Sequence, residues 1–393
     1  MNFKTADRLQ DVGEYYFSTK MREIELMNAN GKAVINLGIG SPDMAPDITV
    51  INTLHIESEK PNTHAYQSYK GNILLRIAIA NFYQQHYQVL LNPNTEILPL
   101  IGSKEGIMHV CMTYFQRGDI VLIPNPGYPT YKSAVTLAGA TATAYNLLEQ
   151  NNWQPDINEI INHFKSGIVK GIFLNYPHMP TGQQPNKDVL TKIIVSAAEY
   201  GVLVIHDNPY SFILNDEPFS LLSIPNAKNV VIELNSLSKS HNLAGWRIGM
   251  LCASETIINN VLRFKSNMDS GMFLPLQLAA AKALALNDTW FNNLNAIYLK
   301  RKIQAIALLQ MLNCVVNESQ VGLFVWAKIP TKYHDAYQLS DEVLQKANVF
   351  ITPGGIFGSN GNNYIRVSLC AKEEIFTEAI QRITDFFKPA TNP

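Results

Sequence analysis

The chain has 393 residues and is poor in cysteine, in net charge and in long apolar runs. Its cysteines are isolated and form no CxxC pair, so we expect neither a metal site nor a disulfide framework, and we favour buried free thiols in a reducing compartment. They are Cys111, Cys252, Cys314 and Cys370. The formal net charge is −1, which argues against nucleic acid and anionic membranes as partners. Without an apolar signal core or a bilayer-length apolar run, the protein is expected in the cytoplasm.

Hydrophobic residues make up 47% of the chain and charged residues 16%, so we expect a large core, and the length suits two domains. In the central part, apolar strand-like runs alternate with helical segments. This alternation predicts a mostly parallel sheet that is covered by helices on both faces. The expected strands are 119–124, 140–147, 169–175, 202–207 and 229–234.

The last hundred residues change character, because one long helix is followed by short strands and a final helix. We expect a smaller α+β unit here, completed by an N-terminal helix over 9–31 and a strand over 33–37. The predicted division is an N-terminal segment at 1–45, a large domain at 46–285 and a small domain at 286–393.

Polar and aromatic side chains follow several of the expected strands. Lys239 comes just after the apolar strand at 229–234, and open α/β sheets bind ligands beyond the carboxyl ends of their strands. A lysine amine there can form a Schiff base with an aldehyde cofactor if burial keeps it partly unprotonated. Taken alone, the stretch is equally consistent with a surface lysine.

Two glycine-containing loops also stand out. Gly102-Ser103-Lys104 opens a helix, where free N–H groups and the helix dipole favour an anion such as phosphate, although an ordinary N-cap is an equal alternative. The segment 38–43 holds two glycines and a proline and marks either a close backbone approach or a plain tight turn, and this piece alone favours the tight turn.

These pieces, in this order, resemble the class I/II aminotransferases, which are pyridoxal-phosphate (PLP) enzymes of fold type I. The resemblance covers about residues 35–369. Its most specific part is Ser236-x-Ser238-Lys239, with Arg247 eight positions after the lysine inside Gly-x-Arg-x-Gly. Asp207-x-x-Tyr210 and Arg366-x-Ser are in register with it.

The resemblance implies an α/β fold with a mostly parallel, seven-stranded-type sheet in the large domain and a smaller α+β domain. It also implies PLP as cofactor and ping-pong transfer of an amino group from an L-amino acid to a 2-oxo acid. Two alternatives stay open. One is another PLP reaction, such as β-elimination of a C–S bond or decarboxylation, and the other is a PLP-binding regulator without turnover.

The family's residue roles carry over to matching positions. Lys239 would hold PLP as an internal aldimine and then move the substrate Cα proton. Asp207 would pair with the pyridine nitrogen, Tyr210 would donate to the ring O3′, and Tyr128 would stack on the ring. The positions that match the phosphate site are Ser103, Lys104, Ser236, Ser238 and Arg247.

Three further positions concern the substrate and the partner. Arg366 matches the arginine that grips the substrate α-carboxylate, helped by the backbone at Gly40. Tyr66 matches a tyrosine that reaches the phosphate of the neighbouring subunit, which implies a homodimer with active sites at its interface.

One position departs from the family pattern, which has Asn-x-Pro-x-Asn-Pro-Thr-Gly where this chain places Met179 at the second asparagine. In the family, that asparagine normally hydrogen-bonds both O3′ and the substrate carboxylate, whereas a thioether is at best a weak hydrogen-bond acceptor. We therefore expect Tyr210 alone to hold O3′, unless His178 or Asn175 reaches it.

The sequence leaves the identity of the amino donor open. The apolar segment 267–273, expected to line the partner's pocket, favours a neutral or aromatic substrate, although interface packing explains it equally well. The run Gly245-Trp-Arg-Ile-Gly249 is also similar to the branch that contains LL-diaminopimelate aminotransferases.

Overall fold

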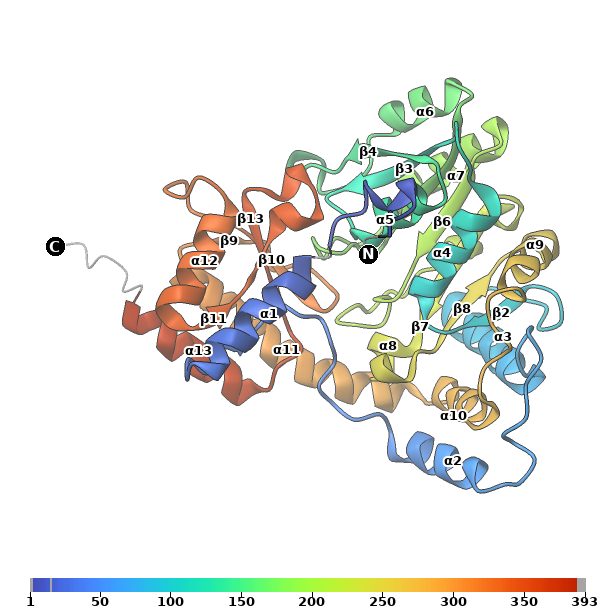
Figure 1. Cartoon of the computed structure of the whole chain (residues 1–393), viewed down its shortest axis with the longest axis horizontal. Coiled ribbons are helices and arrows are strands. Elements are labelled where there is room, and N and C mark those ends of the chain that lie inside the picture. The colour runs from blue at the N-terminus through green and yellow to red at the C-terminus, as the bar shows by residue number, and fades with distance from the viewer. Residues whose placement is uncertain (1–2, 15, 387–393) are drawn as a thin grey trace.

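The computed structural model describes residues 3–14 and 16–386. Residues 1–2, 15 and 387–393, which include the last residues of the expected C-terminal segment 286–393, lie outside the described residues. Figure 1 shows a larger body built around one sheet and a smaller body around β10 (Phe324–Lys328) and β13 (Tyr364–Ser368). The first long helix, α1 (Tyr16–Ala29), lies with the smaller body, and the chain then crosses to α2 (Ile48–Ser58) at the far end of the larger one.

The larger body contains a seven-stranded sheet, in the order β2-β8-β7-β6-β5-β3-β4. The neighbouring strands β7, β6, β5, β3 and β4 run parallel to one another. In contrast, β8 is antiparallel to both of its neighbours, β7 and β2. The predicted mostly parallel sheet is therefore confirmed. The bounds are β2 (Ile97–Leu100), β3 (Ile120–Asn125), β4 (Thr141–Asn146), β5 (Val169–Leu174), β6 (Leu203–Asp207), β7 (Val231–Ser236) and β8 (Gly249–Cys252).

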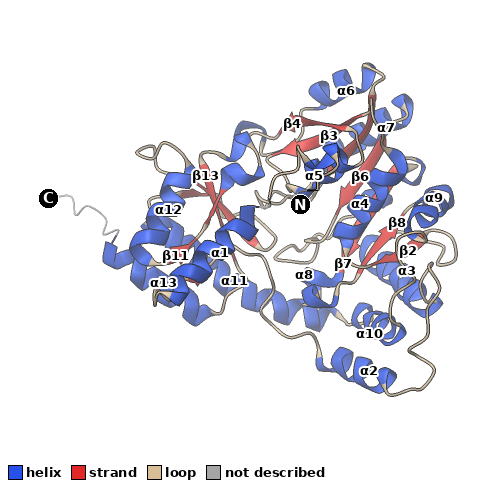
Figure 2. Cartoon of the chain, in the orientation of Figure 1, coloured by secondary structure: helices blue, strands red, loops and turns tan. Residues whose placement is uncertain are grey.

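Helices cover both faces of this sheet (Figure 2). Alternate residues of one strand belong to different cores because successive side chains point to opposite faces. On β6, for example, Ile205 packs in the core formed with Ile107 and Ile257, whereas Val204 packs in the core that contains Leu75 and Leu190. The helices of the first face are α4 (Ser103–Tyr114), α5 (Thr130–Leu137) and α9 (Glu255–Lys265). Those of the second are α3 (Ile73–Tyr87), α6 (Ile157–Lys165), α7 (Lys187–Tyr200) and α10 (Leu274–Leu284).

The smaller body holds a four-stranded antiparallel sheet in the order β12-β13-β10-β9. Beside it, β1 (Ile35–Asn36) pairs in parallel with β11 (Val349–Phe350), which joins the N-terminal segment to the C-terminal part of the chain. The remaining elements are β9 (Val315–Val316), β12 (Thr352–Pro353), α11 (Asp288–Met311), α12 (Ala336–Ala347) and α13 (Glu373–Phe386).

Two details differ from the sequence-based expectation. The N-terminal helix begins at Tyr16 and not near residue 9, where the structure has only a 3-10 turn, η1 (Asp7–Leu9). The expected strand set also lacked two strands of the sheet, β2 and β8: the apolar run at 97–101 is not in that set, and of β8 only Gly249 belongs to the glycine–arginine motif. None of the described helices is long and apolar enough to cross a membrane.

Candidate active site

A cavity of about 510 Å³ lies beyond the carboxyl ends of the parallel strands and is also bordered by the smaller body. Every predicted site residue except Tyr66 lines it. These residues are Gly40, Ser103, Lys104, Tyr128, Asp207, Tyr210, Ser236, Ser238, Lys239, Arg247 and Arg366. Tyr66 is 90% exposed on the loop ahead of α3, so the single chain does not bring it to the cavity.

One end of the cavity is a cradle of backbone and hydroxyl groups. Ser236 ends β7 and caps the short helix α8 (Leu237–Ser240), because its Oγ accepts from the Ser238 N–H at 3.0 Å. Opposite, α4 begins at Ser103 with its free N–H groups, which favour an anion. Gly102 adopts a φ of +79°, and a Cβ there would overlap the Arg247 guanidinium. Glycine is thus required for the arginine to reach the start of the helix.

Lys239 lies on α8 with its amine directed at the backbone of the loop 38–43. Its Nζ donates to the Gly40 carbonyl oxygen at 2.5 Å. Burial lowers the pKa of this lysine, the charges of Arg366 and Arg247 lower it further, and the thiol of Cys370 opposes them. A lowered pKa leaves more of the amine uncharged and nucleophilic.

Asp207 ends β6 and is almost completely buried. Its Oδ2 accepts from the Tyr131 hydroxyl at 2.8 Å, and its backbone carbonyl accepts from Asn175 Nδ2 at 2.7 Å. Burial raises the pKa of Asp207 to about 6, while the Tyr131 hydrogen bond and the charge of His206 lower it. The other oxygen, Oδ1, is buried and has no hydrogen-bond partner among the described residues.

That unpartnered oxygen tests whether PLP fits this chain. A buried acceptor without a partner costs about 1–3 kcal/mol, and a ligand that donates a hydrogen bond there would relieve this cost. The pyridine nitrogen of PLP, when protonated, is such a donor, and the cradle at Ser103 and Arg247 suits its phosphate. The residues present therefore fit PLP.

Two tyrosines complete this end of the cavity. Tyr210 is half-buried and packs edge-on against Phe324, with ring centroids 5.8 Å apart. Burial raises the pKa of Tyr210, so the phenol keeps its proton and can donate a hydrogen bond. Tyr128 meets the ring of Tyr131 edge-on at 5.6 Å. Tyr131 itself was not singled out from the sequence, where its only signal was its position three residues after Tyr128 in a proline-rich loop.

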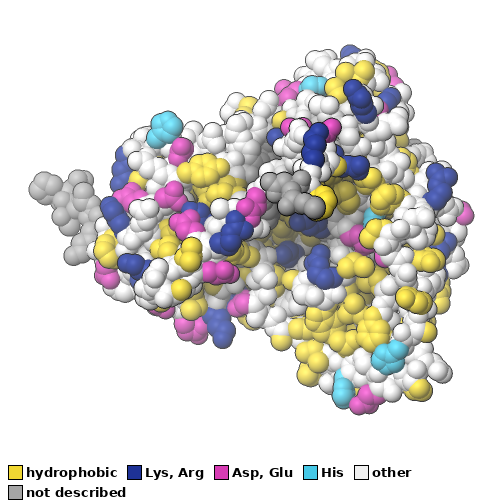
Figure 3. Space-filling view, viewed as in Figure 1, with side chains coloured by type: hydrophobic (Ala, Val, Ile, Leu, Met, Phe, Trp, Pro, Cys, Tyr) yellow, Lys and Arg dark blue, Asp and Glu magenta, His cyan; other side chains and the backbone are white. Residues whose placement is uncertain are grey.

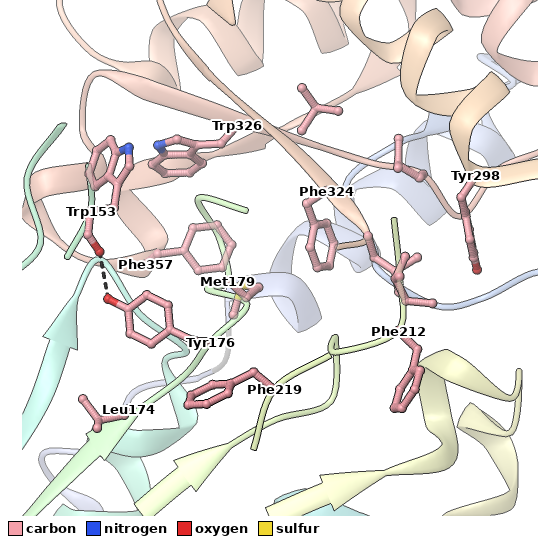
Figure 4. Close-up of a cluster of buried hydrophobic side chains, with 14 of the residues drawn as sticks. Trp153, Leu174, Tyr176, Met179, Phe212, Phe219, Tyr298, Phe324, Trp326 and Phe357 are labelled. Carbon is pink, nitrogen blue, oxygen red and sulfur yellow. Dashed lines mark hydrogen bonds between the residues drawn. The ribbon is translucent and has the colours of Figure 1, made fainter. Parts of the chain in front are cut away.

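The other end of the cavity is built around Arg366 on β13. Its Nη2 donates to the Gly38 carbonyl at 2.8 Å, and its Nη1 lies 3.2 Å from the sulfur of Met179. The guanidinium carbon lies 3.9 Å from the ring centre of Phe324 and 4.6 Å from that of Phe357. Figure 4 shows Met179 between these two rings. Besides the Gly38 carbonyl, the arginine therefore contacts aromatic faces and a soft sulfur, which are favourable but weak partners for a cation.

The polar side chains next to Met179, those of Asn175 and His178, form hydrogen bonds with other groups of the protein. Asn175 Oδ1 accepts from the Met179 backbone N–H at 2.9 Å, and His178 Nδ1 lies 2.8 Å from Thr181 Oγ1. Of the two side chains that were considered for O3′, Asn175 lines the cavity and His178 does not.

The loop 38–43 closes the cavity from the side of the smaller body. Gly40 packs so closely on Phe324 that a Cβ would overlap the ring. Asp43 forms a two-bond ion pair with Arg301 of α11, at 2.7 and 2.9 Å. The backbone of this segment therefore approaches the Phe324 ring closely, so the segment is more than a plain tight turn.

Comparison with known proteins agrees with this site. Residues 32–383 match the family model "Aminotransferase class I and II". The LL-diaminopimelate aminotransferase of Oleidesulfovibrio alaskensis is 38% identical over 384 residues, which cover 97% of this chain and 98% of that protein. The enzyme of the same name from Aquifex aeolicus is 36% identical over 383 residues, 97% and 98% of the two chains.

Solved structures give the same result. Apo-BacF from Bacillus subtilis superposes with a TM-score of 0.94 at 35% identity, over 99% of both chains. An aromatic aminotransferase from Pyrococcus horikoshii superposes with a TM-score of 0.85 at 26% identity, over 93% of this chain and 97% of that one. This chain belongs to the class I and II aminotransferases, and it is a PLP-dependent aminotransferase of fold type I.

Proposed function

We propose that the amino donor of this aminotransferase is an L-amino acid with an uncharged, apolar or aromatic side chain. The observation that supports this is the apolar wall around Arg366. Phe17 and Met21 of α1, Ile39 of the loop 38–43, Phe324 and Phe357 all line the cavity there. Asp207 is the only acidic side chain among the described residues that line the cavity, and it lies at the opposite end.

The wall would favour apolar groups for a simple reason. Each buried CH₂ group of a substrate gains about 0.8 kcal/mol on leaving water, whereas a buried charge without a partner is strongly disfavoured. Diaminopimelate, the substrate in the name of the curated relatives, carries a second ammonium and a second carboxylate. Comparing its reaction rate with that of a neutral donor therefore tests the proposed donor class.

The roles of the cavity residues are part of this proposal. When bound, PLP supplies an aldehyde for the amino group and a ring that withdraws electrons from Cα. Lys239 would hold that aldehyde, and its freed amine would move the Cα proton. Asp207 would pair with the ring nitrogen, Tyr210 would donate to O3′, and Tyr128 would pack on the ring. The residues that would hold the phosphate are Ser103, Lys104, Ser236, Ser238 and Arg247.

On the substrate side, Arg366 would bind the α-carboxylate, with the backbone at Gly40 beside it. The weak contact between Arg366 Nη1 and the Met179 sulfur supports this role, since a carboxylate oxygen is a much better acceptor than a thioether.

A donor panel tests the substrate class. Purified enzyme is mixed with L-phenylalanine, L-leucine, L-glutamate or LL-diaminopimelate, and the loss of the absorption band of the lysine-bound cofactor is followed. We expect the neutral donors to react at least tenfold faster at equal concentration, since ten-fold discrimination needs only about 1.4 kcal/mol. Faster reaction of diaminopimelate would contradict the donor class alone. Release of pyruvate and ammonia without an oxo-acid acceptor would instead indicate an elimination reaction.

We also propose a homodimer in which Tyr66 reaches the phosphate end of the neighbouring site. Apolar side chains are exposed on α2 and α3, next to the loop that carries Tyr66, and Figure 3 shows hydrophobic side chains gathered over the α2–α10 region. The exposed residues are Ile48, Ile51 and Ile56 on α2 and Ile73, Leu74 and Ile77 on α3. An apolar patch of this kind marks an interaction surface. Sedimentation should give twice the 43.9 kDa mass of the chain.

For the domain division we keep 1–45, 46–285 and 286–393. The pairing of β1 with β11 supports assigning the N-terminal segment to the small domain, and the start of α11 at Asp288 supports the second boundary. A cytoplasmic setting is supported by four cysteines that are all free thiols.

A further inference from the structure

Tyr131 is held in one orientation by its neighbours. It lies in the first turn of α5 and is 1% exposed. Its ring stacks on Phe173 of β5, with centroids 4.6 Å apart and planes at 13°, and it meets Tyr128 edge-on. This packing directs the hydroxyl at Asp207 Oδ2, 2.8 Å away.

In that hydrogen bond the phenol is the donor. Burial, together with the neighbouring charge of Asp207, raises the pKa of Tyr131 well above its usual range, so the hydroxyl keeps its proton. An ionised carboxylate can only accept. A donor directed at the charged form of an acid stabilises that form, and here it acts against burial, which favours the neutral acid.

The other groups around Asp207 do not replace this donor. On its own strand, the ring of His206 points away to Glu233 of β7, with Nδ1 2.8 Å from Oε2. Asn175, after β5, bonds the backbone carbonyl of Asp207 and not its carboxylate. Tyr210 and Tyr128 are the remaining titratable neighbours, and no hydrogen bond joins either of them to Asp207 among the described contacts.

We propose that Tyr131 is a positioning residue: it fixes Asp207 as an oriented carboxylate, with one oxygen held by the phenol and the other left for the ring nitrogen of PLP. The inference rests on the proposed role of Asp207. Because Tyr131 stabilises the charged carboxylate, the shared proton should stay on the ring nitrogen. Without the hydroxyl, the proton should move toward Asp207.

The test locates that proton in the full-length holoenzyme. The protein is loaded with PLP that carries ¹⁵N in the ring, and the ¹⁵N chemical shift is measured in wild type, Y131F, Y145F and D207N. The control Y145F deletes an equally buried hydroxyl, which donates to the Phe173 carbonyl at 2.8 Å in the same sheet. Y131F keeps the ring and its stacking on Phe173.

We expect the wild-type shift to report a protonated nitrogen, D207N an unprotonated one, Y131F a value between them, and Y145F the wild-type value. The rate constant kcat of Y131F should fall roughly tenfold, the effect of losing one hydrogen bond to a charged group. Equal shifts in wild type and Y131F, or the same displacement in Y145F, would overturn the role of Tyr131. Equal shifts in wild type and D207N would instead overturn the role of Asp207. If Y131F fails to fold, F173L loosens the same ring without removing the hydroxyl and should displace the shift in the same direction.

Discussion

The two ends of the cavity are built in different ways. The cofactor end consists of residues at or soon after the ends of strands of one sheet, such as Asp207 at the end of β6 and Lys239 on α8 after β7, and each of these two has a specific hydrogen bond. The substrate end collects side chains from α1, β10 and the segment near Phe357, and there Arg366 contacts aromatic faces and a thioether besides its hydrogen bond to the Gly38 carbonyl. The fixed hydrogen bonds at the first end suit a single chemical reaction, whereas the apolar packing at the second end suits discrimination between substrates.

If the two ends are separate in function, variants at the cofactor end should change kcat and those at the substrate end should change KM. The largest effect is expected for Lys239→Ala, which removes the amine that would move the Cα proton. Loss of a general base costs roughly 10²–10⁴ in rate. Full turnover should fall by that factor for every donor, measured as oxo-acid formation.

A matched control for this variant is Lys192→Ala, which removes an exposed lysine from α7, away from the cavity and the proposed dimer surface. Turnover in that control should equal wild type. A Lys239→Ala enzyme that lost activity for one donor class only would break the separation between the two ends.

A smaller effect, this time on stability, is expected for Asp207→Asn in the cofactor-free protein. The folded-state pKa of Asp207, about 6, is higher than its ordinary value of 3.8. Its contribution is therefore present below pH 3.8 and is lost as the pH rises through 6, at a cost of up to about 3 kcal/mol. Asparagine does not titrate, so the free energy of unfolding of the variant, relative to wild type, should rise between pH 4 and pH 7.

Urea unfolding at both pH values measures this difference. The control is Asp216→Asn, which neutralises an exposed carboxylate outside the cavity and should show no such gain. A pH-independent difference for Asp207→Asn would mean that the carboxylate is not held in a buried environment.

The smallest effect is expected for Met179→Asn, which restores the residue usual in the family beside Arg366. An amide donor to the substrate carboxylate is worth roughly 1.5–3 kcal/mol, so KM should fall at least about tenfold for all donors while kcat changes little. Steady-state kinetics with one neutral donor measures both constants. The control Met179→Leu keeps the apolar volume, and its KM should stay within about threefold of wild type because the thioether is a weak acceptor. A change in kcat for Met179→Asn that Met179→Leu does not show would mean that the introduced amide also acts on the cofactor end.

Much of the fold could be predicted from the sequence because the pattern is local. The apolar runs that became β3 to β7 are short and bounded by turn residues, and parallel buried strands have this appearance. The antiparallel strand β8 was missed, since its four residues follow directly on Gly-Trp-Arg-Ile and carry no turn signal of their own. The start of α1 was placed too early because polar residues with scattered apolar positions do not define a helix end.

Part of the site could be predicted in the same way. The spacing of Ser236, Ser238, Lys239 and Arg247 is fixed by one strand and one turn, so it is visible in the chain. The hydrogen bond of Tyr131 to Asp207 joins residues 76 positions apart, and no local pattern indicates it. The same holds for the contact of Met179 with Arg366, 187 positions apart.

The sequence by itself determined the strand–helix alternation, the lysine after its buried strand and the residues that match the aminotransferase family, because each depends on near neighbours in the chain. Only the tertiary structure decided how Asp207 is held, which oxygen it leaves without a partner, and which rings surround Arg366. Those features depend on how α5, β6 and the two bodies pack against one another, and packing distances between remote segments are set by the whole core.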